Sequence, residues 1–255
     1  MTPTGIIRLE REGPEGAGLA KMELDPRDFQ SELPEQHIHV CYQDPALGIA
    51  VGVWTTTDMQ EAFGPYPDDE FMVVLEGRVL MIDGQGRETP VEQGECFFVH
   101  KAIPISWKQE GFLRKFFITH SAPGVPAPRI ASADGGVIVF TPQALEAGLV
   151  PQEMTIGGGS QRDNLVTTNA IGNMTVGMWE TTAFESAMQP FSVHEFAHIV
   201  EGDVTIVEAE DTRHHFRAGD TFFVPQGTVC SWRSDGLLRK FYAIVDPKVA
   251  PQSTG

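Results

Sequence analysis

The stretch Glu195-Phe-Ala-His-Ile-Val-Glu-Gly202 decides the fold, because a near-copy of it, Glu70 to Gly77, stands 125 positions earlier. Both are largely apolar runs that end in Glu-Gly, where glycine supplies the positive φ of a tight turn. A second matched segment follows each run, Gly94 to Val99 in the first copy and Gly219 to Val224 in the second. Because every match has the same offset without a gap, the sequence predicts a tandem duplication.

The repeated copies, near 45–120 and 170–247, are predicted to be built from strands. Short apolar runs such as Phe71 to Leu75 alternate with turn signals such as Asp83-Gly-Gln-Gly86, and a 3.6-residue periodicity is almost absent. This pattern favours a small antiparallel barrel or sandwich in each copy. Further matched pairs are Trp54 and Trp179, Pro65 and Pro190, Trp107 and Trp232, and Leu113 to Phe116 with Leu238 to Phe241.

The domain organisation follows from the repeat and from the prolines between its copies. The length of 255 residues is enough for two domains of ordinary size. We expect an N-terminal domain with a leader over 1–120 and a C-terminal domain over 166–255. Residues 121–165 are interpreted as a linker and connecting segment, since prolines cluster in 119–135 and cannot donate to a sheet.

The second copy closes with Gly219-Asp-Thr-Phe-Phe-Val-Pro225-Gln-Gly227. The order of Glu195, Gly202 and this segment resembles the two signature motifs of the cupin family, whose fold is a double-stranded β-helix of the RmlC-like jelly-roll type. Two copies resemble a two-domain cupin, or bicupin. Trp232 and the Arg-Lys pair ending at Lys240 resemble the ureidoglycine aminohydrolase-type subfamily. The expected fold is therefore all-β, with tandem duplicated cupin jelly-roll barrels.

In metal-binding cupins, the resemblance implies a His-x-His before the motif glutamate and a further histidine after Pro-x-Gly. Alternate residues of a strand point to one face, so this spacing aims two imidazoles into the barrel. Here the corresponding positions of the second copy hold Gln189, Phe191, Glu195 and Cys230. Those of the first copy hold Gly64, Tyr66, Glu70 and Ile105.

Two interpretations of the motif glutamates stay open. As a metal site, Glu195, Gln189 and Cys230 would hold a divalent ion such as Mn, Fe, Ni or Zn. As a structural feature, each carboxylate would be buried and held by hydrogen bonds or by a basic residue, for example one of the Arg114-Lys115 or Arg239-Lys240 pair. His194 and His198 are expected on the opposite face from Glu195, because strand residues alternate.

The candidate ligand-binding residues are those expected to face the barrel interiors. They are Glu195, Gln189, Phe191, Cys230, Trp232 and Glu70. The first hypothesis is a bicupin that binds a small polar metabolite in the C-terminal barrel, with a degenerate metal site. The alternatives are a metal-dependent hydrolase similar to ureidoglycine aminohydrolase and a non-catalytic structural or regulatory cupin.

Composition limits the partners. The net charge of −17 at pH 7 argues against nucleic acid and anionic membranes, which would be repelled. Three cysteines form no disulfide framework, and neither a signal peptide nor a membrane-spanning run is evident. We therefore expect a cytoplasmic protein, with a small-molecule ligand as partner, that forms a homodimer through exposed sheet faces or edges.

Overall fold

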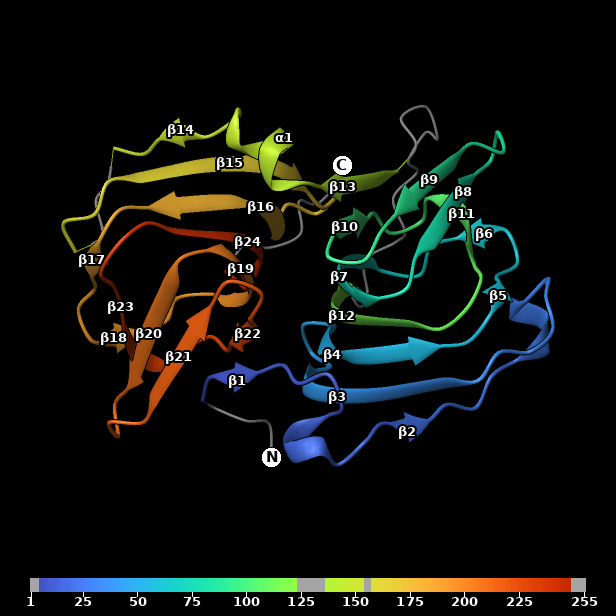
Figure 1. The fold of residues 1–255 in the computed structure, drawn as a ribbon, viewed down its shortest axis with the longest axis horizontal. Coiled ribbons are helices and arrows are strands. Elements are labelled where there is room, and N and C mark those ends of the chain that lie inside the picture. The colour runs from blue at the N-terminus through green and yellow to red at the C-terminus, as the bar shows by residue number, and fades with distance from the viewer. Residues whose placement is uncertain (1–4, 123–135, 154–156, 249–255) are drawn as a thin grey trace. The chain divides into compact units, whose positions relative to one another are not determined.

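The computed structural model describes residues 5–122, 136–153 and 157–248 of the chain (Figure 1). It contains two compact units. The N-terminal unit comprises Leu9–Phe140, and the C-terminal unit comprises Met1–Arg8 and Thr141–Gly255. Each unit consists of one seven-stranded and one five-stranded antiparallel sheet, whose apolar faces pack on each other.

The large sheet of the N-terminal unit has the strand order β13-β10-β7-β12-β4-β3-β2. Its strands are β2 (Ala20–Lys21), β3 (Gln36–Asp44), β4 (Ile49–Thr56), β7 (Asp69–Glu76), β10 (Cys96–Val99), β12 (Leu113–His120) and β13 (Val137–Phe140). The small sheet has the order β5-β11-β8-β9, with β6 also paired to β11. Its strands are β5 (Met59–Gln60), β6 (Gly64–Pro65), β8 (Val79–Asp83), β9 (Glu88–Val91) and β11 (Pro104–Gln109).

The large sheet of the C-terminal unit has the strand order β1-β22-β19-β24-β16-β15-β14. Its strands are β1 (Ile7–Arg8), β14 (Val150–Pro151), β15 (Gln161–Thr168), β16 (Met174–Thr181), β19 (His194–Glu201), β22 (Thr221–Val224) and β24 (Leu238–Val245). The small sheet has the order β17-β23-β20-β21, with β18 also paired to β23. Its strands are β17 (Phe184–Glu185), β18 (Gln189–Pro190), β20 (Asp203–Glu208), β21 (Arg213–Arg217) and β23 (Val229–Ser234).

The two units share strand order and register. Glu70 pairs with Val99 in the N-terminal unit, and Glu195 pairs with Val224 in the C-terminal unit, at the offset seen in the sequence. Strands β3 to β12 of the N-terminal unit are arranged in the same order as β15 to β24 of the C-terminal unit. The duplication is therefore present in the structure as well as in the sequence. The predicted all-β fold of tandem duplicated double-stranded β-helix barrels is confirmed.

Strand alternation directs the motif glutamate into the barrel. On β19, Ala197 and Ile199 belong to the buried core of the C-terminal unit, with Phe222 and Val224 of the neighbouring β22. Glu195 is two residues before Ala197 and therefore lies on the same face of the strand. The sequence of β19 thus places a carboxylate among apolar side chains.

Short segments outside the repeat complete the sheets. β1 pairs with β22 at the edge of the large C-terminal sheet, and β13 pairs with β10 at the equivalent edge of the N-terminal one. Within the segment 121–165 that was expected to be a linker, the structure forms β13, helix α1 (Pro142–Glu146), β14 and the start of β15. Most of the proline cluster in 119–135 lies outside the described residues.

Helices are short in the described part of the chain. Besides α1, there are 3-10 turns η1 (Pro14–Gly16) and η2 (Pro26–Asp28). Before η2, the Asp25 carboxylate accepts a hydrogen bond from the Arg27 backbone N–H at 2.9 Å, which caps the turn. Among the described residues, none of the helices has the length and apolar character needed to cross a membrane.

The turn after β19 depends on a glycine. Gly202 has a φ of 80°, as Gly77 has a φ of 83° at the equivalent turn, and this confirms the predicted positive φ at Gly77. A Cβ at Gly202 would lie 1.9 Å from the Leu237 carbonyl oxygen. Gly219 also has a positive φ, 92°, but a Cβ there would meet nothing within 4 Å.

These two glycines make a matched pair. We expect Gly219→Ala to lower the free energy of unfolding by about 1–2 kcal/mol, because it adds only the strain of a left-handed backbone at a residue with a Cβ. Gly202→Ala should cost about 1–3 kcal/mol more, because its new methyl group also overlaps backbone atoms. Urea unfolding followed by tryptophan fluorescence measures both. Equal destabilisation by the two substitutions would contradict the close approach of Leu237.

Candidate functional site

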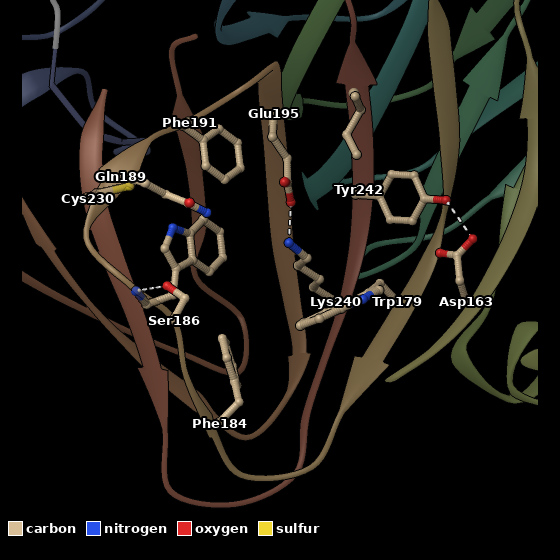
Figure 2. A pocket seen from close by; sticks show the side chains of 12 residues that line it. Asp163, Trp179, Phe184, Ser186, Gln189, Phe191, Glu195, Cys230, Lys240 and Tyr242 are labelled. Carbon is tan, nitrogen blue, oxygen red and sulfur yellow. Dashed lines mark hydrogen bonds and ion pairs between the residues drawn. The ribbon is translucent and has the colours of Figure 1, made fainter. Parts of the chain in front are cut away.

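A cavity of about 370 Å³ lies inside the C-terminal barrel (Figure 2). Five of its twelve lining residues are aromatic, and five polar side chains stand among them. Side chains from both sheets converge on it, because alternate residues of each strand face the barrel interior. The lining residues are Asp163, Trp179, Phe184, Ser186, Gln189, Phe191, Glu195, Cys230, Trp232, Lys240, Tyr242 and Ile244.

The charged centre of this cavity is a buried ion pair. Lys240 of β24 donates from Nζ to Oε1 of Glu195 on β19, and Figure 2 shows the two side chains pointing at each other. Their side chains are only 8% and 5% exposed. The same Nζ lies 4.8 Å from the ring centroid of Trp179 and 4.6 Å from that of Trp232. Ion pairing and two cation–π contacts therefore hold the ammonium in place.

A second polar pair lines another part of the cavity. The Tyr242 hydroxyl donates to Oδ2 of Asp163 at 3.4 Å. Burial raises the pKa of Asp163, while the hydrogen bond from Tyr242 and the charge of Lys240 act to lower it. Burial, followed by the charge of Asp163, raises the pKa of Tyr242 as well. The phenol consequently keeps its proton and serves as a donor.

Tyr242 stands opposite a glycine. Gly177 of β16 pairs with Tyr242 of β24, and a Cβ at Gly177 would lie 2.6 Å from the tyrosine hydroxyl oxygen. The glycine thus leaves space for the phenol group, which a larger residue would displace. Gly177 is part of the repeat. This close approach gives a physical reason for a glycine at its position.

One wall of the cavity contains a buried indole N–H, that of Trp232. The Trp232 ring stacks on Phe191 with centroids 5.6 Å apart and planes 9° from parallel. Its indole Nε1 is buried, and no oxygen or nitrogen of the described residues accepts a hydrogen bond from it. Burial raises the pKa of the neighbouring Cys230 thiol, and the indole N–H acts in the opposite direction. Since a thiol is a weak acceptor, this buried N–H is only weakly satisfied.

The structure brings together five of the six candidate residues. Gln189, Phe191, Glu195, Cys230 and Trp232 all line the C-terminal cavity. Gln189 is solvent-exposed and lies on β18, which pairs with Cys230 of β23. The sixth candidate residue, Glu70, lies in the N-terminal barrel and lines a separate cavity.

Sequence reasoning missed several lining residues. Trp179 is part of the repeat, so its position could have been inferred from its match with Trp54. Lys240 was named only as a possible partner of the glutamate, and that alternative is the arrangement observed. Asp163 lies in the segment expected to be a connection and has no signal in the repeat.

The donor set does not fit a divalent metal. Glu195 is engaged by the Lys240 ammonium, whose positive charge would also repel a cation beside it. Burial raises the pKa of Cys230, so forming the thiolate that a metal binds would cost more than at an exposed cysteine. The third predicted ligand, Gln189, offers one neutral, exposed amide. Within 5–122, 136–153 and 157–248, no three His, Cys, Asp or Glu side chains converge as metal ligands do.

The two histidines that flank Glu195 lie outside this site, as strand alternation predicted. His194 accepts a hydrogen bond from the Gln226 backbone N–H at 3.2 Å and stacks on Phe223. His198 contacts the Thr221 hydroxyl through Nδ1 at 2.8 Å. Neither histidine lines the cavity.

The N-terminal barrel repeats the ion pair. Lys115 donates from Nζ to Oε1 of Glu70 at 2.8 Å, with both side chains less than a tenth exposed. The Lys115 ammonium lies 4.9 Å from the Trp54 ring and 4.6 Å from the Trp107 ring. We call this arrangement of a glutamate, a lysine and two tryptophans the ion-pair cluster. Each barrel contains one.

Comparison with known proteins agrees with this architecture. Residues 168–242 match the EutQ-like cupin domain, so the chain contains a cupin domain. A protein of unknown function from Pseudomonas syringae pv. tomato, a member of the DUF861 family, is 23% identical, with a TM-score of 0.76 over 95% of this chain and all of that one. Curated protein sequences include no match.

Two other solved structures share the fold at low identity. A cupin 2 conserved barrel domain protein from Leptotrichia buccalis is 10% identical, with a TM-score of 0.55 over 90% of this chain and all of that one. Salicylate 1,2-dioxygenase from Pseudoaminobacter salicylatoxidans is 11% identical, with a TM-score of 0.55 over 78% of this chain and 69% of that one. At these identities the similarity concerns the fold alone.

The ion-pair cluster predicts a specific pattern of stability. Lys240→Met should destabilise the protein by about 3–5 kcal/mol, because it leaves the Glu195 carboxylate buried without a partner. The double variant Glu195→Leu/Lys240→Met should recover most of this loss, since no charge is left unpaired. Chemical unfolding of the single and double variants measures the difference. A double variant less stable than the single one would refute this account.

Proposed function

We propose that this protein is a bicupin that binds a small, uncharged organic molecule with polar groups in its C-terminal barrel, without a metal ion. The observation that carries this proposal is the cavity of about 370 Å³ around the buried pair of Glu195 and Lys240. The charge balance of that pair and the aromatic walls define what the cavity accepts.

The size of the cavity supports binding over a purely structural role. A volume of about 370 Å³ falls within the range of small-molecule sites, and it would hold about a dozen waters at roughly 30 Å³ each. A barrel that served only as a scaffold would be expected to fill with side chains, as protein interiors normally do. The mixture of aromatic walls and a few polar groups is also typical of binding sites.

The lining supports a ligand without net charge. Lys240 already has Glu195 as its counterion, so the described lining residues offer no free cation to an anionic ligand. Asp163 adds negative character and would disfavour an anion further. A planar, neutral molecule could contact the aromatic side chains of the wall while a polar atom of it meets the exposed Gln189 amide.

The metal-dependent hydrolase similar to ureidoglycine aminohydrolase is the principal alternative. It would require Glu195 to leave Lys240 and to coordinate an ion together with Gln189 and Cys230. The structural or regulatory cupin is the other alternative, and it would require that nothing bind in the cavity. The cytoplasmic location and the homodimer stay predictions.

Metal content separates the first alternative from our proposal. We expect protein purified without chelators to contain Mn, Fe, Ni and Zn at far below one equivalent per chain. Inductively coupled plasma mass spectrometry measures this, with Glu195→Gln and Cys230→Ser as matched samples. One equivalent of a metal in the wild type, lost in both variants, would support the metal-dependent hydrolase and contradict the metal-free proposal.

Charge selectivity tests ligand binding itself. Nicotinamide and nicotinate have nearly the same shape, but nicotinate is an anion at pH 7. We expect nicotinamide to bind at least about tenfold more tightly, because the anion would be buried without a counterion. Isothermal titration calorimetry on the full chain gives both affinities.

Two substitutions at equivalent positions control for the place of binding. Ser186→Phe, which fills the C-terminal cavity, should abolish nicotinamide binding. Glu61→Phe makes the corresponding change in the N-terminal barrel and should leave that binding intact. If neither compound binds the wild type, or if nicotinate binds more tightly, the proposed ligand chemistry is wrong.

A further inference from the structure

The N-terminal barrel contains a second cavity, of about 280 Å³, which the proposed function does not use. It surrounds the other ion-pair cluster and has room for about nine waters at roughly 30 Å³ each. Aromatic side chains form much of its wall, and several carboxylates face it. The lining residues are Met22, Gln36, Ile38, Trp54, Glu61, Tyr66, Pro67, Asp68, Glu70, Trp107, Lys115, Phe117 and Thr119.

The two cavities keep the ion-pair cluster but differ in charge around it. Glu61 stands where the C-terminal barrel has Ser186, and Asp68 stands where it has Val193. Asp163, which the C-terminal cavity has in addition to Glu195, is replaced by Ile38. The N-terminal cavity therefore has three carboxylates and one ammonium among its lining residues, and it carries an excess of negative charge when they are ionised.

That ammonium is already engaged. Glu70 accepts hydrogen bonds from Lys115 Nζ at 2.8 Å and from the Tyr66 hydroxyl. The Glu61 carboxylate, by contrast, makes no hydrogen bond or ion pair with any residue in the described part of the chain. Its backbone is fixed, because its N–H donates to the Trp107 carbonyl at 2.8 Å. The Glu61 carboxylate thus extends from a fixed backbone position and lines the cavity without a cation of its own.

The electrostatic surroundings leave Glu61 poorly compensated. Burial raises its pKa to about 7, Lys115 acts to lower it, and Glu70 and Asp28 raise it further. Burial and then Glu70 also raise the pKa of Asp68, against the charge of Lys101. A positive charge that entered the cavity would stabilise both carboxylates.

The geometry favours an organic cation over a metal ion. Among the described residues, no three acidic, histidine or cysteine side chains come close enough to coordinate one ion. The aromatic walls of the cavity would instead suit a compact apolar body. We propose that the N-terminal barrel binds a small organic monocation, such as a protonated amine or a guanidinium compound, with its charge beside Glu61 and its body against the rings of Trp54 and Phe117.

Benzylamine and benzyl alcohol provide the test, because they share a shape and differ in charge. At pH 8, benzylammonium should bind the full chain at least about tenfold more tightly than benzyl alcohol by isothermal titration calorimetry. Glu61→Gln keeps the side-chain shape and should weaken benzylammonium binding about tenfold. Ser186→Ala, at the equivalent C-terminal position, should leave it unchanged. Thermal unfolding of each variant establishes that it is folded.

The pH dependence gives a second readout. A bound cation favours the ionised form of Glu61, so binding releases a proton near pH 7 and affinity rises with pH. With the pKa of free Glu61 at about 7, the affinity for benzylammonium should increase about tenfold from pH 6 to pH 8. This increase should disappear in Glu61→Gln. Asp68→Asn should weaken binding but retain the dependence on pH.

Several results would overturn the proposal. They are equal affinity for benzylammonium and benzyl alcohol, no binding of benzylammonium by the wild type, and wild-type affinity in Glu61→Gln. Loss of benzylammonium binding in Ser186→Phe with retention in Glu61→Gln would place the amine in the C-terminal cavity and would equally refute it. Because nicotinamide binding is tested separately, failure here leaves the proposed function of the C-terminal barrel intact.

Discussion

A lysine ammonium held between two indole rings and a carboxylate lies at the centre of each barrel. Neither Glu195 nor Lys240 could stay charged in an aromatic interior alone, since an unpaired buried ion costs several kcal/mol. Together they satisfy each other, and the rings of Trp179 and Trp232 complete the surroundings of the ammonium. The four residues come from β16, β19, β23 and β24, so the cluster joins strands of both sheets of the barrel.

The ion-pair cluster also decides which chemistry each barrel can support. A carboxylate neutralised by an internal cation is poorly suited to hold a metal ion, and it leaves the remaining lining residues to select a ligand. Those residues differ between the barrels: Ser186 and Asp163 in one, Glu61 and Ile38 in the other. Duplication has thus kept the frame of the cavity while its charge diverged, which is why the two barrels are proposed to prefer different ligands.

Much of the fold could be predicted because its signals are local and repeated. The turn glycines at Gly77 and Gly202 and the alternating strand from Glu195 to Glu201 follow from backbone geometry alone. The edge strands could not be predicted in the same way. β1 and β13 are short segments whose pairing with β22 and β10 brings together residues far apart in the chain. The short β-like run at Ile6 to Leu9 can be recognised in the sequence, but its pairing partner is set by the sheet edge that it meets.

For the site, the sequence determined that Glu70 and Glu195 would enter the barrels, because a period of two residues fixes the face of a strand. It also identified Gln189, Phe191 and Cys230 as residues at the positions of interest. Only the tertiary structure decided that the Lys240 ammonium takes the place beside Glu195. Its strand, β24, comes 45 residues later, and the contact arises from side-by-side pairing of the two strands. Electrostatic compensation inside a barrel depends on which charges meet in space, and no local pattern along the chain encodes that.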